Sequence, residues 1–326
     1  MTIEFTIMTW NLENLFPVGH EFGPTSQEVF DQKLENIAQT ILSIAPDVLA
    51  VQEVGDPAPF LELQQRLGGF FPHGRLAEHF ENLHPIRVGL LSRLPLGNIG
   101  ELFDFPNGAL LNINDARGNI IRDMGRGALK AEVELAPGLT INVVTTHLKS
   151  KLITYPNNRR SPRNEHERAR EAGSALIKRT VQAVALRVFV NDMVTGNSQP
   201  LILLGDLNDG PEAVTTQILL GPEDRSLSHP GKTDDVTLYN LADYIPADHR
   251  FSRIFHNQRE LIDHIMVSHE LIFRHRQVDS FVARIESIGQ SVRSRREAVL
   301  PDHAPVFARF EIPEPSATGD PIPVPG

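Results

Sequence analysis

The chain has 326 residues, of which 40% are hydrophobic, so it can form one large domain or two ordinary ones with a sizeable core. It contains no cysteine, which excludes disulfides and thiolate chemistry, and its formal net charge of -10 argues against a uniformly basic nucleic-acid-binding surface. No apolar run reaches the roughly 20 residues of a membrane span, and the N-terminus lacks the basic start of a leader, so we expect a cytoplasmic protein.

Strand-like runs dominate the chain. Each run is rich in Val, Ile, Thr or Phe and is bounded by Gly, Pro, Asp or Asn. Several are almost entirely apolar, as expected of strands that are covered on both faces. In chain order, the predicted strands are residues 3–12, 47–54, 87–92, 127–135, 139–148, 200–207, 261–268 and 305–312.

Helical periodicity predicts helices over residues 28–45 and 163–194, and a shorter helix near 59–67. Ser26 or Thr25 can cap the first of these helices. Because no proline-rich linker divides the elements, we expect one α/β domain with two packed sheets over residues 1–312. Residues 313–326 are rich in Pro and Gly and are expected to form a flexible tail. Nothing in the sequence implies a protein partner.

Basic residues are concentrated in one part of this acidic chain. Residues 149–179 contain nine Lys or Arg but only three Glu, and Arg293, Arg295 and Arg296 form a second cluster. Such clusters can line a groove for a phosphate backbone. A solvated, charged helix explains the first cluster equally well.

Polar side chains interrupt or end the predicted strands. These residues are Asn11, Glu13, Glu53, His147, Asp206, Asn208, Asp263, His264, Asp302 and His303. A single Asn or Asp at a strand end is usually a turn residue, and a single strand histidine is usually a satisfied core residue. Glu53 and Asp263 differ, because Glu53 follows the run LAVQ and Asp263 lies within LIDHIMV, and an unpaired buried carboxylate is costly at either place. A hard divalent cation is the simplest common partner for such oxygens.

The blocks TWNLEN, LAVQEV, THLKSK, GDLND, IDHIMVS and PDHAP occur in this order. Together they resemble the endonuclease/exonuclease/phosphatase family, nearest to its bacterial nuclease-like members. The resemblance covers roughly residues 4–312. It implies a four-layered α/β sandwich, with two facing, mostly antiparallel sheets flanked by helices. It also implies hydrolysis of phosphoester bonds with a divalent metal, usually Mg²⁺, although Mn²⁺ or Ca²⁺ would suit the same ligands.

The resemblance implies a metal site at Glu53, the main ligand. Asn11 lies beside it in the family pattern, Glu13 takes the place of a second acid, and Asp302 completes the surroundings. Mg²⁺ prefers oxygen ligands and keeps several waters, so a few protein groups suffice.

The resemblance also implies roles for the remaining strand-end residues. Asp206 is expected to orient or deprotonate the attacking water, and Asn208 to donate to the phosphate oxygens. His303 is expected to contact the phosphate as an acid or base, with Asp263 as its carboxylate partner. His147 is expected near the scissile phosphate.

Two further residues, His264 and Asp209, lie next to members of this pattern, and Pro301 departs from the family pattern. His264 is expected to face away from the site, because adjacent strand side chains point to opposite faces. Asp209 is interpreted as a turn residue. The last block reads PDH where many members have SDH, so Pro301 removes a hydroxyl and a backbone donor.

The substrate is specified less well than the chemistry. Residues expected to bind the phosphates of a substrate are Lys149, Arg159, Arg160, Arg170 and Arg295. A nuclease acting on DNA or RNA fits these residues and the nuclease-like blocks. A phosphatase or phosphodiesterase for a small-molecule or lipid phosphate fits the acidic net charge. A binding module with a dead active site would lack core residues, and none of them is missing.

Overall fold

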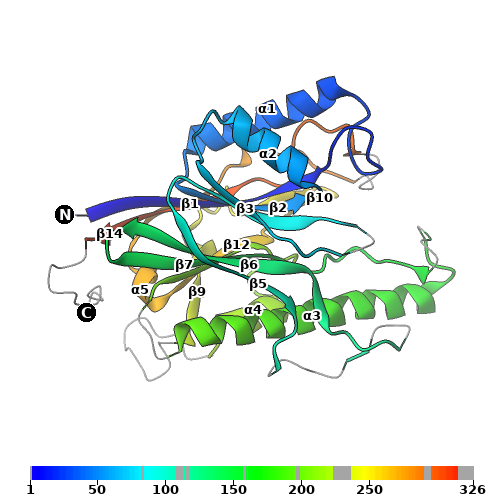
Figure 1. Cartoon of the computed structure of the whole chain (residues 1–326). Coiled ribbons are helices and arrows are strands. Elements are labelled where there is room, and N and C mark those ends of the chain that lie inside the picture. Colours follow the sequence, from blue (N-terminus) through cyan, green and yellow to red (C-terminus); the bar gives the residue numbers. More distant parts are fainter. Residues whose placement is uncertain are drawn as a thin grey trace.

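Two six-stranded sheets pack face to face in the computed structural model, and helices cover their outer sides (Figure 1). The structure describes residues 2–81, 84–107, 113–114, 118–156, 159, 161–195, 199–222, 236–289 and 295–314. The predicted four-layered α/β sandwich is confirmed.

The first sheet has the strand order β13-β14-β1-β2-β4-β3. Its strands are β1 (Thr2–Leu15), β2 (Val48–Val54), β3 (His73–Leu76), β4 (Arg87–Ser92), β13 (His275–Ser280) and β14 (Val306–Pro313). β1 pairs parallel with β2 and antiparallel with β14. The β1–β2 register shifts between Asn11 and Leu15, so the strands separate where the polar residues begin.

The second sheet has the order β5-β6-β7-β8-β12-β9. Its strands are β5 (Leu96–Asp104), β6 (Asp123–Ala136), β7 (Leu139–His147), β8 (Leu201–Asp206), β9 (Leu238–Asn240) and β12 (Asp263–Ser268). β8 pairs parallel with β7 and antiparallel with β12. In this register Asp206 lies opposite both His147 and Asp263, so three predicted site residues share one sheet end.

Helices α1 (Gln27–Ile44) and α2 (Pro57–Arg66) cover the first sheet, whereas α3 (Glu165–Val194) and α4 (Val214–Leu220) cover the second (Figure 1). Ser26 caps α1 as predicted, since its hydroxyl accepts a hydrogen bond from the Val29 amide. The short helix α5 (His269–Ile272) and the hairpin β10 (Arg253–Phe255) and β11 (Gln258–Glu260) lie outside the main layers. Two 3₁₀ segments, Leu241–Tyr244 and Val282–Arg284, complete the elements described. None of the helices described is long and apolar enough to cross a membrane.

Three apolar layers hold the sandwich together. The central layer lies between the sheets and includes Ile7, Val48, Leu90, Val143 and Leu204, all of which are buried. The outer layers lie between each sheet and its helices. Strands that contribute to two layers have apolar residues on both faces, which explains their nearly continuous apolar sequences.

The sequence analysis missed β3, β5, β9, β10, β11, β13 and the helices α4 and α5. Most of these are three to six residues long, and β3, β5, β9 and β13 lie at or next to a sheet edge. β5 is longer, but it has only one buried residue, Leu102, and therefore no apolar pattern to reveal it. Of the predicted tail, residues 315–326 lie outside the described part of the chain, whereas Pro313 still pairs with Thr2.

Candidate active site

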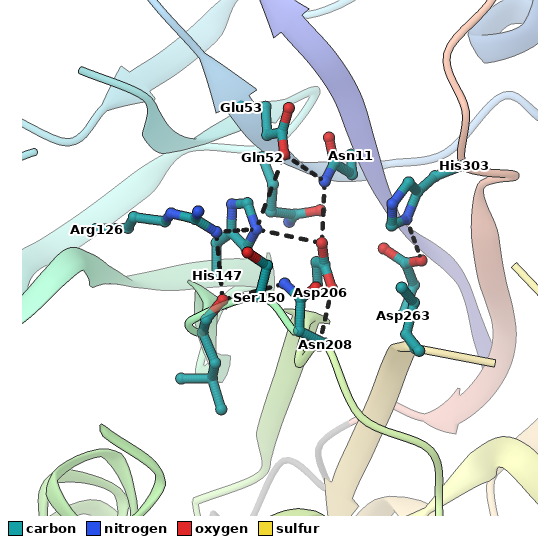
Figure 2. Close-up of polar contacts among 12 residues, drawn as sticks. Asn11, Gln52, Glu53, Arg126, His147, Ser150, Asp206, Asn208, Asp263 and His303 are labelled. Atoms are coloured by element: carbon teal, nitrogen blue, oxygen red, sulfur yellow. Dashed lines mark hydrogen bonds and ion pairs between the residues drawn. The ribbon is translucent and has the colours of Figure 1, made fainter. Parts of the chain in front are cut away.

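Polar side chains from both sheets meet at one edge of the sandwich (Figure 2). Asn11 and Glu53 come from β1 and β2 of the first sheet. His147, Asp206 and Asp263 come from β7, β8 and β12 of the second sheet. His303 reaches the same place from the segment before β14, and Asn208 from the loop after β8 (Figure 2). The site therefore exists only when the two sheets are packed together.

Asp206 lies at the centre of this group. Its Oδ2 atom accepts a hydrogen bond from Asn11 Nδ2 at 2.9 Å and lies 3.2 Å from His147 Nε2. Its Oδ1 atom accepts from the Asn208 amide at 2.9 Å. Burial alone would raise the pKa of Asp206, but His147, His303 and Asn11 outweigh burial and hold the pKa well below its usual range. Asp206 is therefore an ionised carboxylate with a partner on each of its oxygens.

Glu53 is held by the bulge in β1. Its Oε1 atom accepts from Asn11 Nδ2 at 3.2 Å, and its Oε2 atom accepts from the Asn14 amide at 2.9 Å. Burial raises the pKa of Glu53, but the positive groups His147 and Arg126 outweigh this effect, so the net shift is downward. The carboxylate is consequently charged and fixed, as a cation ligand should be.

Strained backbone is concentrated at this edge. Four non-glycine residues in or beside the site have left-handed φ values: Glu13 (47°), Asn14 (52°), Glu53 (61°) and Asn208 (57°). Such conformations cost free energy for residues with a Cβ and persist only where surrounding contacts enforce them. Their concentration where the carboxylates converge is typical of a functional site.

His303 and Asp263 form a buried pair. His303 Nδ1 lies 2.6 Å from Asp263 Oδ2, and Trp10 Nε1 donates to the His303 carbonyl at 2.8 Å. Burial alone lowers the pKa of His303, but the carboxylates of Asp263 and Asp302 outweigh it and raise the pKa to about 10. Burial also raises the pKa of Asp263. The proton of this pair resides on His303, which is an imidazolium at neutral pH.

Arg126 is a site residue that the sequence analysis did not assign. Its Nη1 atom contacts His147 Nε2 and donates to the Leu148 carbonyl at 3.3 Å (Figure 2). Burial and the Arg126 charge lower the pKa of His147, and the neighbouring carboxylates of Asp206 and Glu53 oppose this shift. The only sequence signal was Arg126 preceding the block GALKAEV.

Ligand atoms of Asp206, Asp263 and His303 all lie within 4.8 Å of one another, so this group could hold a metal ion. The Oδ1 atom of Asp263 is buried and has no hydrogen-bond partner among the residues that the structure describes. An orphaned buried carboxylate oxygen is costly, and a cation or substrate proton would satisfy it. The donor set is therefore chemically suited to a hard cation, although a cation bound to His303 would have to displace its proton.

Three of the predicted metal ligands, Glu13, Asp302 and Asn11, have partners within the chain. The Glu13 carboxylate pairs with Arg295, at 2.5 Å from Nε and 2.9 Å from Nη2. Asp302 lies 3.7 Å from Arg253 Nε and 4.0 Å from His303 Nε2. Asn11 presents its amide nitrogen to Glu53 and Asp206, and its oxygen accepts from the Glu13 amide. Metal ligation by Glu13, Asn11, Glu53 and Asp302 stays a prediction.

The predicted phosphate-binding residues are largely paired within the chain. The Lys149 ammonium donates to the Leu152 carbonyl at 2.9 Å. Arg159 pairs with Glu167, and Arg170 pairs with Glu171 at 3.0 Å. Arg160 lies outside the described residues. The start of α3 is thus cross-linked by its own charges, and phosphate binding by these residues stays a prediction.

His264 and Asp209 lie beside the site. As predicted, His264 faces away from it: its ring nitrogens contact Asn240 Nδ2 and the Asp209 carbonyl. Asp209 follows β8 in a bend, but its carboxylate has a structural partner, since Oδ2 accepts from Arg179 Nε and Thr215 Oγ1, both at 2.6 Å.

A two-sheet sandwich with ionised carboxylates, an imidazolium and a candidate cation site at one edge defines a phosphoesterase type of hydrolase. The sequence matches the model of the Endonuclease/Exonuclease/phosphatase family over residues 8–284, and the chain belongs to this family. The resemblance that the sequence blocks carry is confirmed.

Solved structures share the fold at low sequence identity. An endonuclease/exonuclease/phosphatase from Beutenbergia cavernae DSM 12333 is 17% identical with a TM-score of 0.56, covering 97% of this chain and 76% of that chain. The 3′ phosphatase NExo from Neisseria, bound to a product DNA hairpin, is 20% identical with a TM-score of 0.55, covering 94% and 99%. The human Nocturnin catalytic domain with bound sulfate anion is 17% identical with a TM-score of 0.54, covering 94% of each chain. A search of curated proteins finds no significant match.

Proposed function

We propose that this protein is a Mg²⁺-dependent phosphodiesterase that acts on DNA or RNA. The observation that carries the proposal is the convergence of Asn11, Glu53, His147, Asp206 and the Asp263–His303 pair from both sheets at one edge. Membership of the family and the similar fold of a protein bound to a DNA product support it.

The charges of the site suit a phosphoester. The imidazolium of His303 and the guanidinium of Arg126 can neutralise a phosphate and stabilise charge that develops on it during reaction. The Asn208 side chain donates to the Leu148 carbonyl through Nδ2, which fixes its amide beside Asp206. These groups bind and orient the phosphate in the proposal.

Asp206 is better suited to orient water than to deprotonate it. A general base works best when its pKa lies near the working pH, and the pKa of Asp206 is held far below that. We therefore assign Asp206 to hold the attacking water by accepting its hydrogen bond. The imidazolium of His303 is the proton donor available for the leaving oxygen.

A divalent cation fits the carboxylates of this edge. Glu53 would hold it, with Asn11, Glu13 and Asp302 as further candidates, and the orphaned oxygen of Asp263 offers a second position. When bound, Mg²⁺ would supply charge neutralisation and orientation of the phosphate.

A second candidate is a phosphatase or phosphodiesterase for a small-molecule or lipid phosphate. Its support is that Arg159 and Arg170 are engaged with Glu167 and Glu171, which leaves fewer free cations for a long phosphate backbone.

A substrate panel tests the proposal. Purified protein with Mg²⁺, Mn²⁺ or Ca²⁺ is assayed on single- and double-stranded DNA, RNA, nucleotides, inositol phosphates and lipid phosphodiesters. We expect Mg²⁺-dependent cleavage of nucleic acid that falls by at least about a hundredfold in Glu53→Gln and in Asp206→Asn. Glu62→Gln, on the exposed side of α2, is the matched control. Hydrolysis of only a small or lipid phosphate would favour the second candidate.

A further inference from the structure

A pocket of about 310 Å³ lies beside the catalytic edge and is not used by the mechanism above. Its lining includes the half-buried rings of Phe80 and Phe103, together with Lys149, Lys178 and Gln182. Ligand pockets are generally about 300–1,000 Å³, so this one suits a single ring system with its sugar.

The pocket is continuous with the catalytic groups along the chain. Lys149 lies two residues after His147, and Gly125, which also lines the pocket, directly precedes Arg126. Two residues span at most about 7 Å of chain. The pocket therefore borders the part of the catalytic edge that His147 and Arg126 form.

Gln182 of α3 makes one wall rigid. Its Oε1 atom accepts from the Lys149 amide at 2.7 Å, and its Nε2 atom donates to the Met124 carbonyl at 2.7 Å. This buried side chain thus ties the segment after β7 to the start of β6. The wall is preformed, which reduces the ordering cost of binding.

The two aromatic rings are also held in place. The guanidinium of Arg87 lies 3.8 Å from the centroid of Phe80, and the imidazole of His79 stacks on Phe103 with centroids 4.7 Å apart. Phe80 and Phe103 are far apart in sequence and belong to no run of aromatic residues. The sequence alone therefore did not reveal them as a pair. Held rings are the stacking platforms on which proteins bind bases.

Polar groups of both kinds surround the rings. Glu81 and Asp123 offer acceptors, and Lys178 offers donors. The edge of a nucleobase presents donors and acceptors together, whereas an acyl chain presents neither. The mixture excludes a purely apolar ligand.

We propose that this pocket binds the nucleobase next to the scissile phosphate, by stacking on Phe80 and Phe103. The inference rests on the proposed nuclease function and deepens it: the enzyme requires a base, not only a phosphate backbone.

The kinetic test compares a single-stranded oligonucleotide with an abasic strand of the same length, in wild type and in Phe103→Ala. Base stacking contributes about 1–3 kcal/mol by alanine substitution. We expect KM for the base-containing strand to rise roughly tenfold in Phe103→Ala with kcat within about twofold, since 1.4 kcal/mol corresponds to a factor of ten. Values for the abasic strand should not change. Phe103→Tyr should retain the wild-type KM, and Phe70→Ala, at a half-buried ring beside Arg93, is the matched control.

A binding test separates this inference from the proposed function. Adenosine and thymidine monophosphates, with 3′ or 5′ phosphate, and ribose 5-phosphate are titrated into Asp206→Asn protein by calorimetry. We expect nucleotides to bind roughly tenfold more tightly than the sugar phosphate, and Phe103→Ala to abolish this difference. Equal affinities, or equal loss on both strands in Phe103→Ala, would overturn the base pocket while leaving nuclease activity intact. Absence of nucleic-acid cleavage with base-dependent nucleotide binding would instead overturn the nuclease function and keep the pocket.

Discussion

The Asp263–His303 pair sets the protonation state of the site at the scale of single residues. Asp263 is buried, and its oxygen lies 2.6 Å from the imidazole, so it opposes the loss of the His303 proton. The pKa of His303 is raised to about 10, and the ring stays charged through the neutral range. Asp263 thus fixes the positive charge of His303, and in the proposed mechanism this charge acts on the substrate.

Asp263→Asn should therefore change the pH profile. Without the Asp263 carboxylate, only Asp302 and Asp206 still oppose the effect of burial, so the pKa of His303 falls and the alkaline limb of kcat/KM should move from near pH 10 towards neutral pH. Rates measured between pH 5 and 10 with a fixed substrate and metal check this outcome. An unchanged alkaline limb would show that another group titrates there.

The same pair contributes pH-dependent stability. His303 has a folded-state pKa above its unfolded value of about 6.5, so its contribution is complete below that pH and is lost as pH rises towards 10. In Asp263→Asn, this loss between pH 6.5 and 10 should be smaller. Urea unfolding at several pH values measures it.

Glu13 has two roles open to it, metal ligand or partner of Arg295. Its carboxylate makes two short contacts to Arg295, and Arg295 also donates to the Leu300 carbonyl at 3.1 Å. These contacts join the strained end of β1 to the segment before His303. We expect Glu13→Gln to keep the Mg²⁺ dependence within about twofold but to lower stability by about 3 kcal/mol, because a largely buried arginine loses its partner. Magnesium titrations of activity and urea unfolding check both parts. A Mg²⁺ requirement raised as strongly as in Glu53→Gln would establish Glu13 as a ligand.

The residues that the sequence revealed lie at the first or last positions of buried strands. Glu53 and Asp206 follow apolar runs and Asp263 begins β12, so the cost of burying these carboxylates can be inferred from the sequence. Arg126 gave only a weak signal, because it lies inside a strand and becomes part of the site only through the pairing of β6 with β7. Gly125, Phe80 and Phe103 were likewise invisible, because only tertiary packing brings them together.

At the scale of elements, Gly205 explains how β7 and β8 can lie close together just before Asp206. Its φ is +143°, and a Cβ at this position would lie 2.0 Å from the Thr146 carbonyl oxygen on β7. The parallel pairing of β7 and β8, which aligns His147 with Asp206, therefore requires glycine here.

Gly205→Ala should separate β7 from β8 and lower the free energy of unfolding by more than about 2 kcal/mol. Activity should fall with it, since Asp206 moves relative to His147. Gly100→Ala on β5 is the matched control, because its Cβ would have nothing within 4 Å. Urea unfolding and rates on one substrate distinguish the two variants. Equal stability of both would contradict the close-approach argument.

Elements were predicted well where burial is two-sided and poorly at edges. The run at residues 47–54 became β2 (Val48–Val54) with little change, because apolar side chains cover both of its faces. The edge strand β5 and the short β9 were missed, since their pairing depends on neighbours rather than on local pattern. Asp209 was interpreted as a turn residue, yet its carboxylate also ties α3 to α4 through Arg179 and Thr215. Turn chemistry is local, whereas that ion pair depends on the packed helices.

At the scale of the whole molecule, the active site is divided between two sheets. Asn11 and Glu53 move with the first sheet, and His147, Asp206 and Asp263 with the second. The apolar layer between the sheets has no directional contacts that would fix their relative position. A bridge of hydrogen bonds beneath the site supplies such directional contacts.

Gln52 forms this bridge. It is fully buried on β2, exchanges hydrogen bonds with Thr9 of β1, and donates to Thr145 Oγ1 of β7 at 3.1 Å. It directly precedes Glu53, so the bridge fixes the first sheet against the second within one residue of the main metal-ligand candidate.

Gln52→Leu should lower stability by about 1–3 kcal/mol, because the hydroxyls of Thr9 and Thr145 lose their partner in a dry core. A triple variant that also carries Thr9→Val and Thr145→Val should regain most of that loss, since replacing all partners by apolar groups is nearly neutral. Urea unfolding measures this difference.

The activity of the same variants tests the bridge itself. If Gln52 aligns the sheets, kcat should be about tenfold lower in both the single and the triple variant, because small misplacements of catalytic groups are costly. This loss should occur although only the single variant is unstable. If Gln52 contributes stability alone, kcat should recover in the triple variant together with stability. Full activity of Gln52→Leu would show that apolar packing is sufficient to align the two halves of the site.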